Sequence, residues 1–149
     1  MDAESLCQLL LDTNQIVVKG VSVGWEEIRL AVESTATRAR CPLCQEESSS
    51  VHSTYSRFPI DLAWAEWVVV SHLRVKRFFC RNDRCSKQTF AERFPGFLAR
   101  YARRTNRALE RQRHIGVEAC SRSAERLLRA IRIGISDTTV NRLLRAIAA

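Results

Sequence analysis

The first half of the chain alternates between apolar and polar side chains, a pattern typical of β-strands. Residues 16–21 and 27–33 flank a turn near Gly24, and apolar side chains occupy every second position of the later segment. This arrangement predicts an antiparallel β-hairpin. A short helix is predicted just before the hairpin, at residues 4–11, because apolar side chains recur there at helical spacing: Leu6, Leu9 and Leu10.

Two further strands are predicted at residues 51–57 and 67–79. In the longer strand the odd positions are mostly apolar, whereas the even positions include Arg74 and Lys76. We expect these two side chains to lie on an exposed basic face, which makes them candidate DNA contacts. The Pro-Gly pair at residues 95–96 marks the predicted end of the β-rich part of the chain.

After residue 97 the apolar positions take helical spacing, and three helices are predicted at residues 98–115, 122–131 and 137–147. The last two carry matching apolar stripes, formed by Ala124, Leu127, Leu128 and Ile131 and by Val140, Leu143, Leu144 and Ile147. Between them, Gly134 is placed to take a left-handed C-cap conformation and Ser136 to act as an N-cap. This layout predicts a helix-turn-helix, although an ordinary pair of packed helices would show the same stripes.

The polar face of the final predicted helix carries residue types that read DNA. Asn pairs with adenine, Arg pairs with guanine, and Thr contacts phosphate or a thymine methyl group. The side chains on this face are Thr138, Asn141, Arg142 and Arg145. Arginines of the first predicted helix are expected to contact phosphates, which adds affinity without sequence information: Arg103, Arg104 and Arg107.

Four of the six cysteines form two close pairs separated by 35 residues. Cys41 and Cys44 form a C-x2-C, and Cys80 and Cys85 form a C-x4-C. Each pair places two thiolates on a tight turn, so together they predict one tetrahedral, structural zinc ion in a zinc-ribbon arrangement. Nearby cations would offset the negative charge of such a centre: Arg40, Arg81, Arg84 and Lys87.

Other interpretations of these cysteines remain open. The four residues could be unrelated buried cysteines, or Cys41 and Cys44 could form a redox-active C-x2-C. A third alternative is a metal site in which His52 replaces one thiol. A site with four protein ligands has no open position for a catalytic water, so the zinc is expected to be structural. The two remaining cysteines, Cys7 and Cys120, are expected to pack as small apolar residues.

The net charge of +8 is distributed unevenly over the 149 residues. Residues 1–37 carry a net charge of −4, residues 38–98 carry +4 and residues 99–149 carry +8, and all 12 basic residues of the last region are arginines. Such a region predicts binding to a nucleic-acid backbone, with a solvated helical surface as the alternative. The sequence shows neither a long apolar segment nor a signal peptide, so we expect a cytoplasmic protein that does not span a membrane.

These features together resemble a known family, the N-terminal DNA-binding part of bacterial insertion-sequence transposases of the ISL-three type. The resemblance covers residues 15–149. The matching motifs are the Cys-Pro-Leu-Cys at residues 41–44, the segments 51–57, 75–80 and 89–93, Cys85, and the Arg-Thr-Asn-Arg run at residues 104–107. The resemblance implies a zinc module followed by a helix-turn-helix, which together recognise terminal inverted repeats during transposition and DNA recombination.

The sequence therefore predicts an α+β protein in three regions. These are an N-terminal helix and hairpin (1–37), a zinc-ribbon-like module (38–96) and a three-helix DNA-binding unit (97–149). Members of the family continue into a catalytic Asp/Asp/Glu domain, which has no counterpart before Ala149, so we expect DNA binding without enzymatic activity. The expected partners are double-stranded DNA in the bacterial nucleoid and either a second copy or a full-length transposase. The alternative functions are a zinc-containing helix-turn-helix transcriptional regulator and a zinc-ribbon protein-interaction adaptor.

Overall fold

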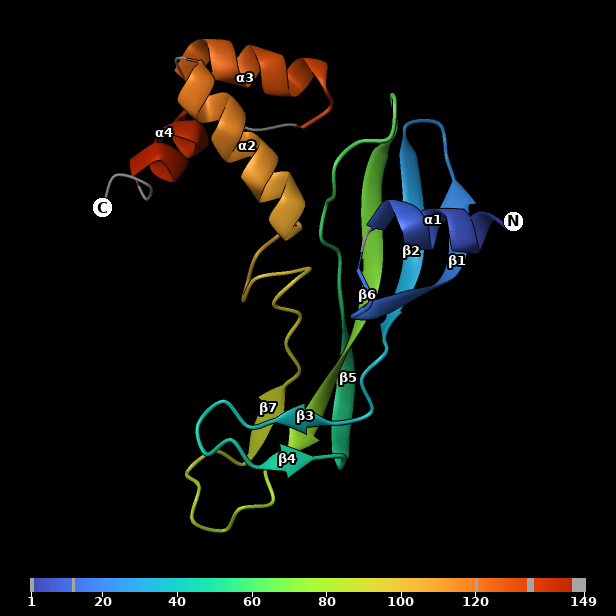
Figure 1. The fold of residues 1–149 in the computed structure, drawn as a ribbon, viewed down its shortest axis with the longest axis vertical. Coiled ribbons are helices and arrows are strands. Elements are labelled where there is room, and N and C mark those ends of the chain that lie inside the picture. Colours follow the sequence, from blue (N-terminus) through green and yellow to red (C-terminus); the bar gives the residue numbers. More distant parts are fainter. Residues whose placement is uncertain (1, 12, 120, 134–135, 146–149) are drawn as a thin grey trace.

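The computed structural model describes residues 2–11, 13–119, 121–133 and 136–145, and it has an α+β fold (Figure 1). Its helices are α1 (Ala3–Leu11), α2 (Asn106–Glu118), α3 (Ser121–Ala130) and α4 (Asp137–Arg145). Its strands are β1 (Ile16–Val23), β2 (Glu27–Ser34), β3 (Ala39–Arg40), β4 (Glu47–Ser48), β5 (Val51–Arg57), β6 (Val68–Phe79) and β7 (Thr89–Ala91). The strands predicted in the first half of the chain are confirmed.

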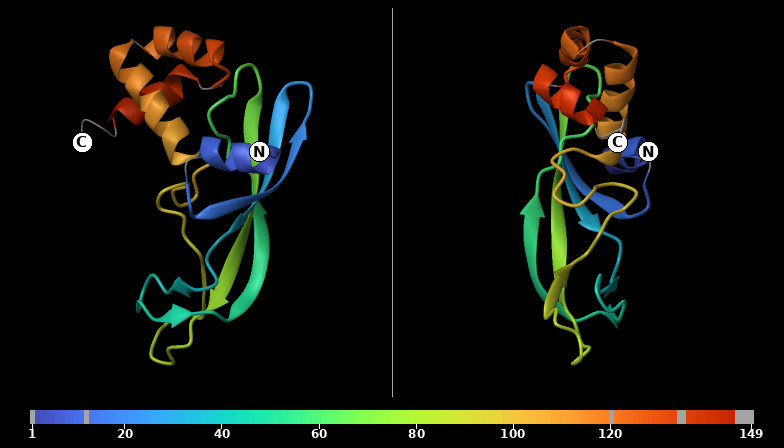
Figure 2. Two further views of the ribbon diagram at one scale, coloured as in Figure 1. Left: turned by 45° about the vertical axis from the view of Figure 1, so that its right-hand side comes forward. Right: turned by 90° about the vertical axis from the view of Figure 1, so that its left-hand side faces the viewer.

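The long strand β6 is the centre of the main sheet. The sheet order is β1-β2-β6-β5, and β7 pairs with the far end of β6. The predicted hairpin of β1 and β2 is antiparallel, whereas β2 pairs with β6 in parallel. With 12 residues, β6 is about 40 Å long. The helices α2–α4 lie near one end of it, and the β3–β4 hairpin with the cysteine loops lies at the other (Figures 1 and 2).

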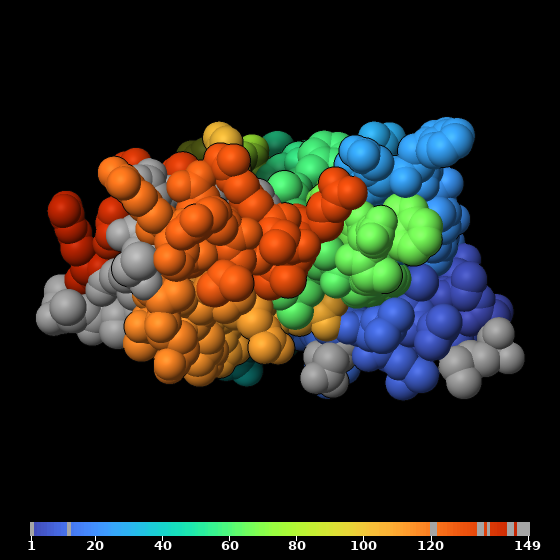
Figure 3. Space-filling view, turned by 90° about the horizontal axis from the view of Figure 1, so that it is seen from above, coloured from blue at the N-terminus to red at the C-terminus, as the bar shows by residue number. Residues whose placement is uncertain are grey.

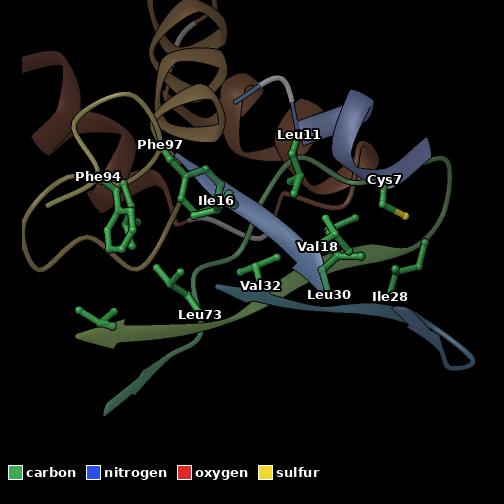
Figure 4. Close-up of a cluster of buried hydrophobic side chains, with 13 residues drawn as sticks. Cys7, Leu11, Ile16, Val18, Ile28, Leu30, Val32, Leu73, Phe94 and Phe97 are labelled. Atoms are coloured by element: carbon green, nitrogen blue, oxygen red, sulfur yellow. The ribbon is translucent and has the colours of Figure 1, made fainter. Parts of the chain in front are cut away.

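Alternating side chains of the sheet form the main core. Val32 and Leu73 point from β2 and β6 toward Ile16 and toward α1 (Figure 4). Helix α1 contributes Cys7 and Leu11, which confirms the predicted packing role of Cys7.

The prediction of the buried face of α1 is wrong, because the three leucines Leu6, Leu9 and Leu10 are exposed. The reason is the amide of Gln8, which turns the helix toward the β1 backbone. Its Nε2 donates to the carbonyl of Ile16 at 3.0 Å, and its Oε1 accepts from the backbone N–H of Val18 at 3.0 Å. These bonds satisfy backbone groups of an edge strand and bring the face of Cys7 onto the core.

The core extends across the predicted end of the β-rich part. Phe94, Phe97 and Leu98 are 3–4% exposed and pack with the sheet residues. The predicted helix at 98–115 begins later, at Asn106, where the Thr105 side chain accepts a hydrogen bond from the N–H of Ala108. Residues 98–105 instead run beside the segment before β6, with backbone hydrogen bonds between Ile60 and both Arg103 and Thr105.

The three C-terminal helices pack on one another around a small second core, formed by Ala124, Leu128, Ile133 and Val140. The structure corrects the predicted stripe of α3, because Leu127 and Ile131 are 52% and 44% exposed. Seen from above, α2 and α3 lie beside the segment that leads into β6 (Figure 3). Among the predicted stripe residues of α4, Val140 is buried, and the side chains of Leu143, Leu144 and Ile147 lie outside the described part.

The connection between α3 and α4 uses a different C-cap from the predicted one. Arg132 takes the left-handed conformation with φ 58°, and the N–H of Ile133 donates to the carbonyl of Leu128 at 2.7 Å. This 6→1 bond is a Schellman motif that ends α3. The predicted C-cap Gly134 lies outside the described residues, as does Cys120. Ser136 is confirmed as the N-cap of α4, since its Oγ accepts from the N–H of Thr139 at 3.3 Å.

Candidate metal centre and basic surfaces

The four paired cysteines meet at the far end of β6. Their sulfur atoms all lie within 4.8 Å of one another. The Cys41 and Cys85 sulfurs are 4.0 Å apart, and those of Cys44 and Cys80 are 3.5 Å apart. Thiolates bound at about 2.3 Å to one tetrahedral ion would be about 3.8 Å apart, so the arrangement is compatible with a bound metal ion.

Each cysteine pair lies on a turn held by backbone hydrogen bonds. In the first turn, the N–H of Gln45 donates to the carbonyl of Cys41 at 2.9 Å, and Gln45 takes a left-handed conformation with φ 62°. In the second turn, the N–H of Cys85 donates to the carbonyl of Asn82 at 2.9 Å, and the N–H of Lys87 donates to the Cys85 sulfur at 3.5 Å. These turns aim all four sulfurs at one point.

A small aromatic core supports the cysteine cluster. Phe78 and Phe90 stack with their ring centres 6.0 Å apart, and they pack against Cys41, which is fully buried. The buried side of β6 changes here, so that Phe78 is buried while the predicted apolar position Phe79 is 37% exposed. The cause is the packing of the cysteine turns on this side of the sheet, where Cys41 and Phe90 cover Phe78. Cys80, two residues after Phe78, belongs to the cluster.

The electrostatics of the cluster favour a bound cation. Desolvation raises the pKa of the Cys41 thiol, but hydrogen bonds from the backbone N–H groups of Cys44 and Leu43 lower it by more. The net result is a pKa of about 7, below the ordinary value of a thiol. At Cys80 the N–H of Asn82 lowers the pKa, but burial and the neighbouring thiols together raise it to about 12. Adjacent thiolates repel one another, and a bound cation would offset their negative charge.

His52 is not a member of the cluster. Its Nδ1 is hydrogen-bonded to the Ser53 hydroxyl at 2.9 Å, and its ring packs edge-on against Phe79 with the ring centres 4.8 Å apart. The candidate metal ligands in the described part of the chain are thus the four cysteines predicted from their spacing.

Helix α4 exposes three of its four side chains predicted to contact DNA. Thr138, Arg142 and Arg145 are exposed and Asn141 is half-buried, whereas Val140 faces the core of the helical unit. The polar face and the apolar face of α4 are therefore arranged as the sequence predicts for the described residues. The adjacent helices add further exposed arginines: Arg111, Arg113, Arg122, Arg126 and Arg129.

The three arginines predicted to lie on the first helix have different surroundings. Arg103 is exposed and Arg104 is half-buried, and both precede α2 rather than lie on it. Desolvation lowers the pKa of Arg104. Arg107 does lie on α2, where its guanidinium forms a salt bridge with the buried carboxylate of Asp61. Its side chain holds the helix to the β-rich part, and a phosphate contact by Arg107 stays a prediction.

The two cations of the predicted basic face of β6 both make contacts within the protein. Arg74 lies 3.5 Å from Glu33, and the Lys76 ammonium donates to the carbonyl of Ala36 at 2.8 Å. Sequence reasoning missed a second group of cations on the opposite face of the sheet, where Arg57 and Arg77 lie beside Tyr55. These residues occupy odd positions of 51–57 and 67–79, and the sequence pattern of 67–79 predicts a mostly apolar face at its odd positions.

Comparison of the chain with protein-family models, curated proteins and solved structures gives no match. None of the described helices is long and apolar enough to cross a lipid bilayer.

Proposed function

We propose that this protein is a zinc-stabilised DNA-binding protein whose helix α4 enters the major groove. Four cysteines form the ligand set that zinc prefers, and soft thiolates select zinc over the hard cations magnesium and calcium. The metal would link the two cysteine turns at the end of β6 and so stabilise a module with a small core of its own.

The observation that carries this proposal is the orientation of α4. Its apolar residue Val140 is 1% exposed, while Arg142 and Arg145 point away from the core and make no ion pair with any described residue. A short helix that turns arginine, asparagine and threonine outward after a capped turn is the arrangement by which helix-turn-helix proteins read base edges.

The charge of the neighbouring helices supports the same function. Two ion pairs involve described arginines of α2–α4, Arg129 with Glu125 and Arg107 with Asp61, which leaves an excess of exposed, unneutralised guanidinium groups. A surface of this kind binds phosphates and makes affinity strongly dependent on salt. We propose that the partner is double-stranded DNA.

The motif resemblance makes the proposal more specific. We propose that the chain is the inverted-repeat-recognition part of an insertion-sequence transposase of the ISL-three type. This proposal covers recognition and assigns no catalytic step to the described residues. A zinc-containing transcriptional regulator would have the same chemistry, and inverted repeats flanking the reading frame would distinguish the transposase.

The test is selection of bound duplexes from a random DNA pool with the zinc-loaded protein. We expect one enriched motif. The Arg142→Ala variant should no longer enrich it, whereas the Arg113→Ala variant, changed at an exposed arginine of α2, should still enrich it. Failure to enrich any motif, together with affinity that does not fall as salt rises, would contradict DNA recognition.

A protein-interaction adaptor is the second candidate, and one feature favours it. An apolar groove of about 490 Å³ lies between α2, α3 and the segment before β6, and Leu127 and Ile131 line it. Exposed apolar patches of this kind mark interaction surfaces. Retention of a protein partner by a variant that no longer binds DNA would favour the adaptor.

A further inference from the structure

A second concentration of positive charge lies far along the sheet from α4. It is a cleft of about 400 Å³ between the strands β5, β6 and β7 and the segment that follows β7. In Figure 1 this segment runs from β7 up to the start of α2. Tyr55 and Arg77 form part of the strand side of the cleft, and Arg93 and Arg100 come from the opposite side.

The cleft is strongly basic. Five cations line it: Arg57, Arg77, Lys87, Arg93 and Arg100. Its one acidic residue is Glu92, which is 5% exposed and whose Oε1 accepts a hydrogen bond from the backbone N–H of Lys76 at 2.6 Å. Arg77 and Arg93 are exposed, and neither forms an ion pair with a residue that the structure describes.

Aromatic rings hold two of the guanidinium groups in place. The Arg77 guanidinium carbon lies 5.4 Å from the ring centre of Tyr55, and that of Arg100 lies 4.5 Å from the ring centre of Tyr101. Tyr101 has φ 59°, a left-handed conformation that is unusual for a tyrosine, and its side chain is 79% exposed.

We infer that this cleft binds phosphate groups of a DNA backbone, as a contact separate from helix α4. The inference rests on the proposed function and extends it to the β-rich part of the protein. Five cations from four segments are more than one phosphate needs, but they suit successive phosphates of a strand that passes along the cleft. Contacts of this type add affinity and fix position, and they carry no base preference.

The test compares two double variants of the zinc-loaded protein on a duplex of mixed sequence. Arg77→Ala with Arg93→Ala removes two free cations of the cleft. Lys19→Ala with Arg29→Ala removes the same charge from exposed positions on β1 and β2, away from the cleft. Zinc content and circular dichroism show whether each variant keeps its fold.

We expect the cleft variant to bind about tenfold more weakly near 0.1 M salt and its salt slope to fall by about two, while the control changes little. Ethylation of individual phosphates identifies the contact directly. Ethylation of a phosphate that the cleft contacts should weaken binding of the original protein but not of the cleft variant. Equal effects of the two double variants would overturn the inference and leave DNA recognition by α4 intact.

Two further outcomes are decisive. If the original protein binds no duplex at any salt concentration, both the inference and the proposed function fail. If poly-glutamate binds to the cleft, and the cleft variant loses this binding without losing affinity for DNA, the occupant is an acidic peptide and the inference is wrong.

Discussion

The guanidinium of Arg107 forms a bidentate ion pair with the carboxylate of Asp61. Its Nε and Nη2 each donate to a different oxygen of Asp61 at 2.7 Å, and the Asp61 side chain is fully buried. The same carboxylate accepts from the Thr105 hydroxyl at 2.7 Å, and Arg107 also donates to the carbonyl of Leu10. One ion pair thus joins the first turn of α2 to the segment before β6 and to α1.

Loss of this ion pair should destabilise the protein strongly. Arg107→Ala leaves a buried carboxylate without its cation, and we expect the free energy of unfolding to fall by about 3–5 kcal/mol. Arg111→Ala, on the exposed side of the same helix, should change it by less than about 0.5 kcal/mol. Urea unfolding of both variants measures the difference. Similar stability of the two variants would show that the ion pair does not hold α2 to the sheet.

The cysteine cluster should bind one zinc ion per chain. Elemental analysis of the purified protein should give close to one zinc, and a strong chelator should unfold the end of β6 that carries β3, β4 and β7. Cys80→Ser should abolish stoichiometric zinc binding. Cys7→Ser, a change at a buried cysteine outside the cluster, should leave the zinc content unchanged. A metal-free protein that keeps its fold in chelator would contradict a structural zinc.

Local sequence patterns predicted the helices and strands of this fold more accurately than they predicted how these elements pack together. The spacing of Cys41, Cys44, Cys80 and Cys85 predicted the cysteine cluster, because each short turn fixes the relative position of its own two thiols. The parallel pairing of β2 with β6 had no local signal, since it joins segments about forty residues apart. The rotation of α1 depends on one side chain, Gln8, and leucine spacing alone suggested the wrong face.

The start of α2 shows a similar limit. Helical spacing of apolar residues predicted a start at residue 98, although Thr105 followed by Asn106 was available as a capping signal. Residues 98–105 are held instead by backbone bonds to Ile60, a tertiary contact that outweighs local helix propensity. The basic cleft depends on the same segment, because its position beside β5 and β6 brings Arg100 near Arg77.

Gln112 offers a test of the helical unit that does not depend on DNA. This residue of α2 is 1% exposed, and neither its amide nitrogen nor its amide oxygen has a hydrogen-bond partner in the described part. A buried amide without partners costs about 1–3 kcal/mol, so Gln112→Leu should raise the free energy of unfolding by about 1 kcal/mol or more. Thermal and urea unfolding measure the change. A marked loss of stability would show that the amide is satisfied, for instance by a buried water.

The last prediction separates the arginine that reads bases from those that hold the backbone. Arg142 is exposed on α4, opposite the buried Val140, and Arg113 is exposed on α2. If α4 enters the major groove, Arg142→Ala should cost about 1–3 kcal/mol at the selected site and should relax base preference there. Arg113→Ala should weaken binding to selected and scrambled duplexes equally and should reduce the salt slope by about one. Titrations of both duplexes at several salt concentrations measure these effects. Equal losses on both duplexes for Arg142→Ala would mean that α4 does not read the sequence, since a side chain that bonds to base edges must discriminate between them.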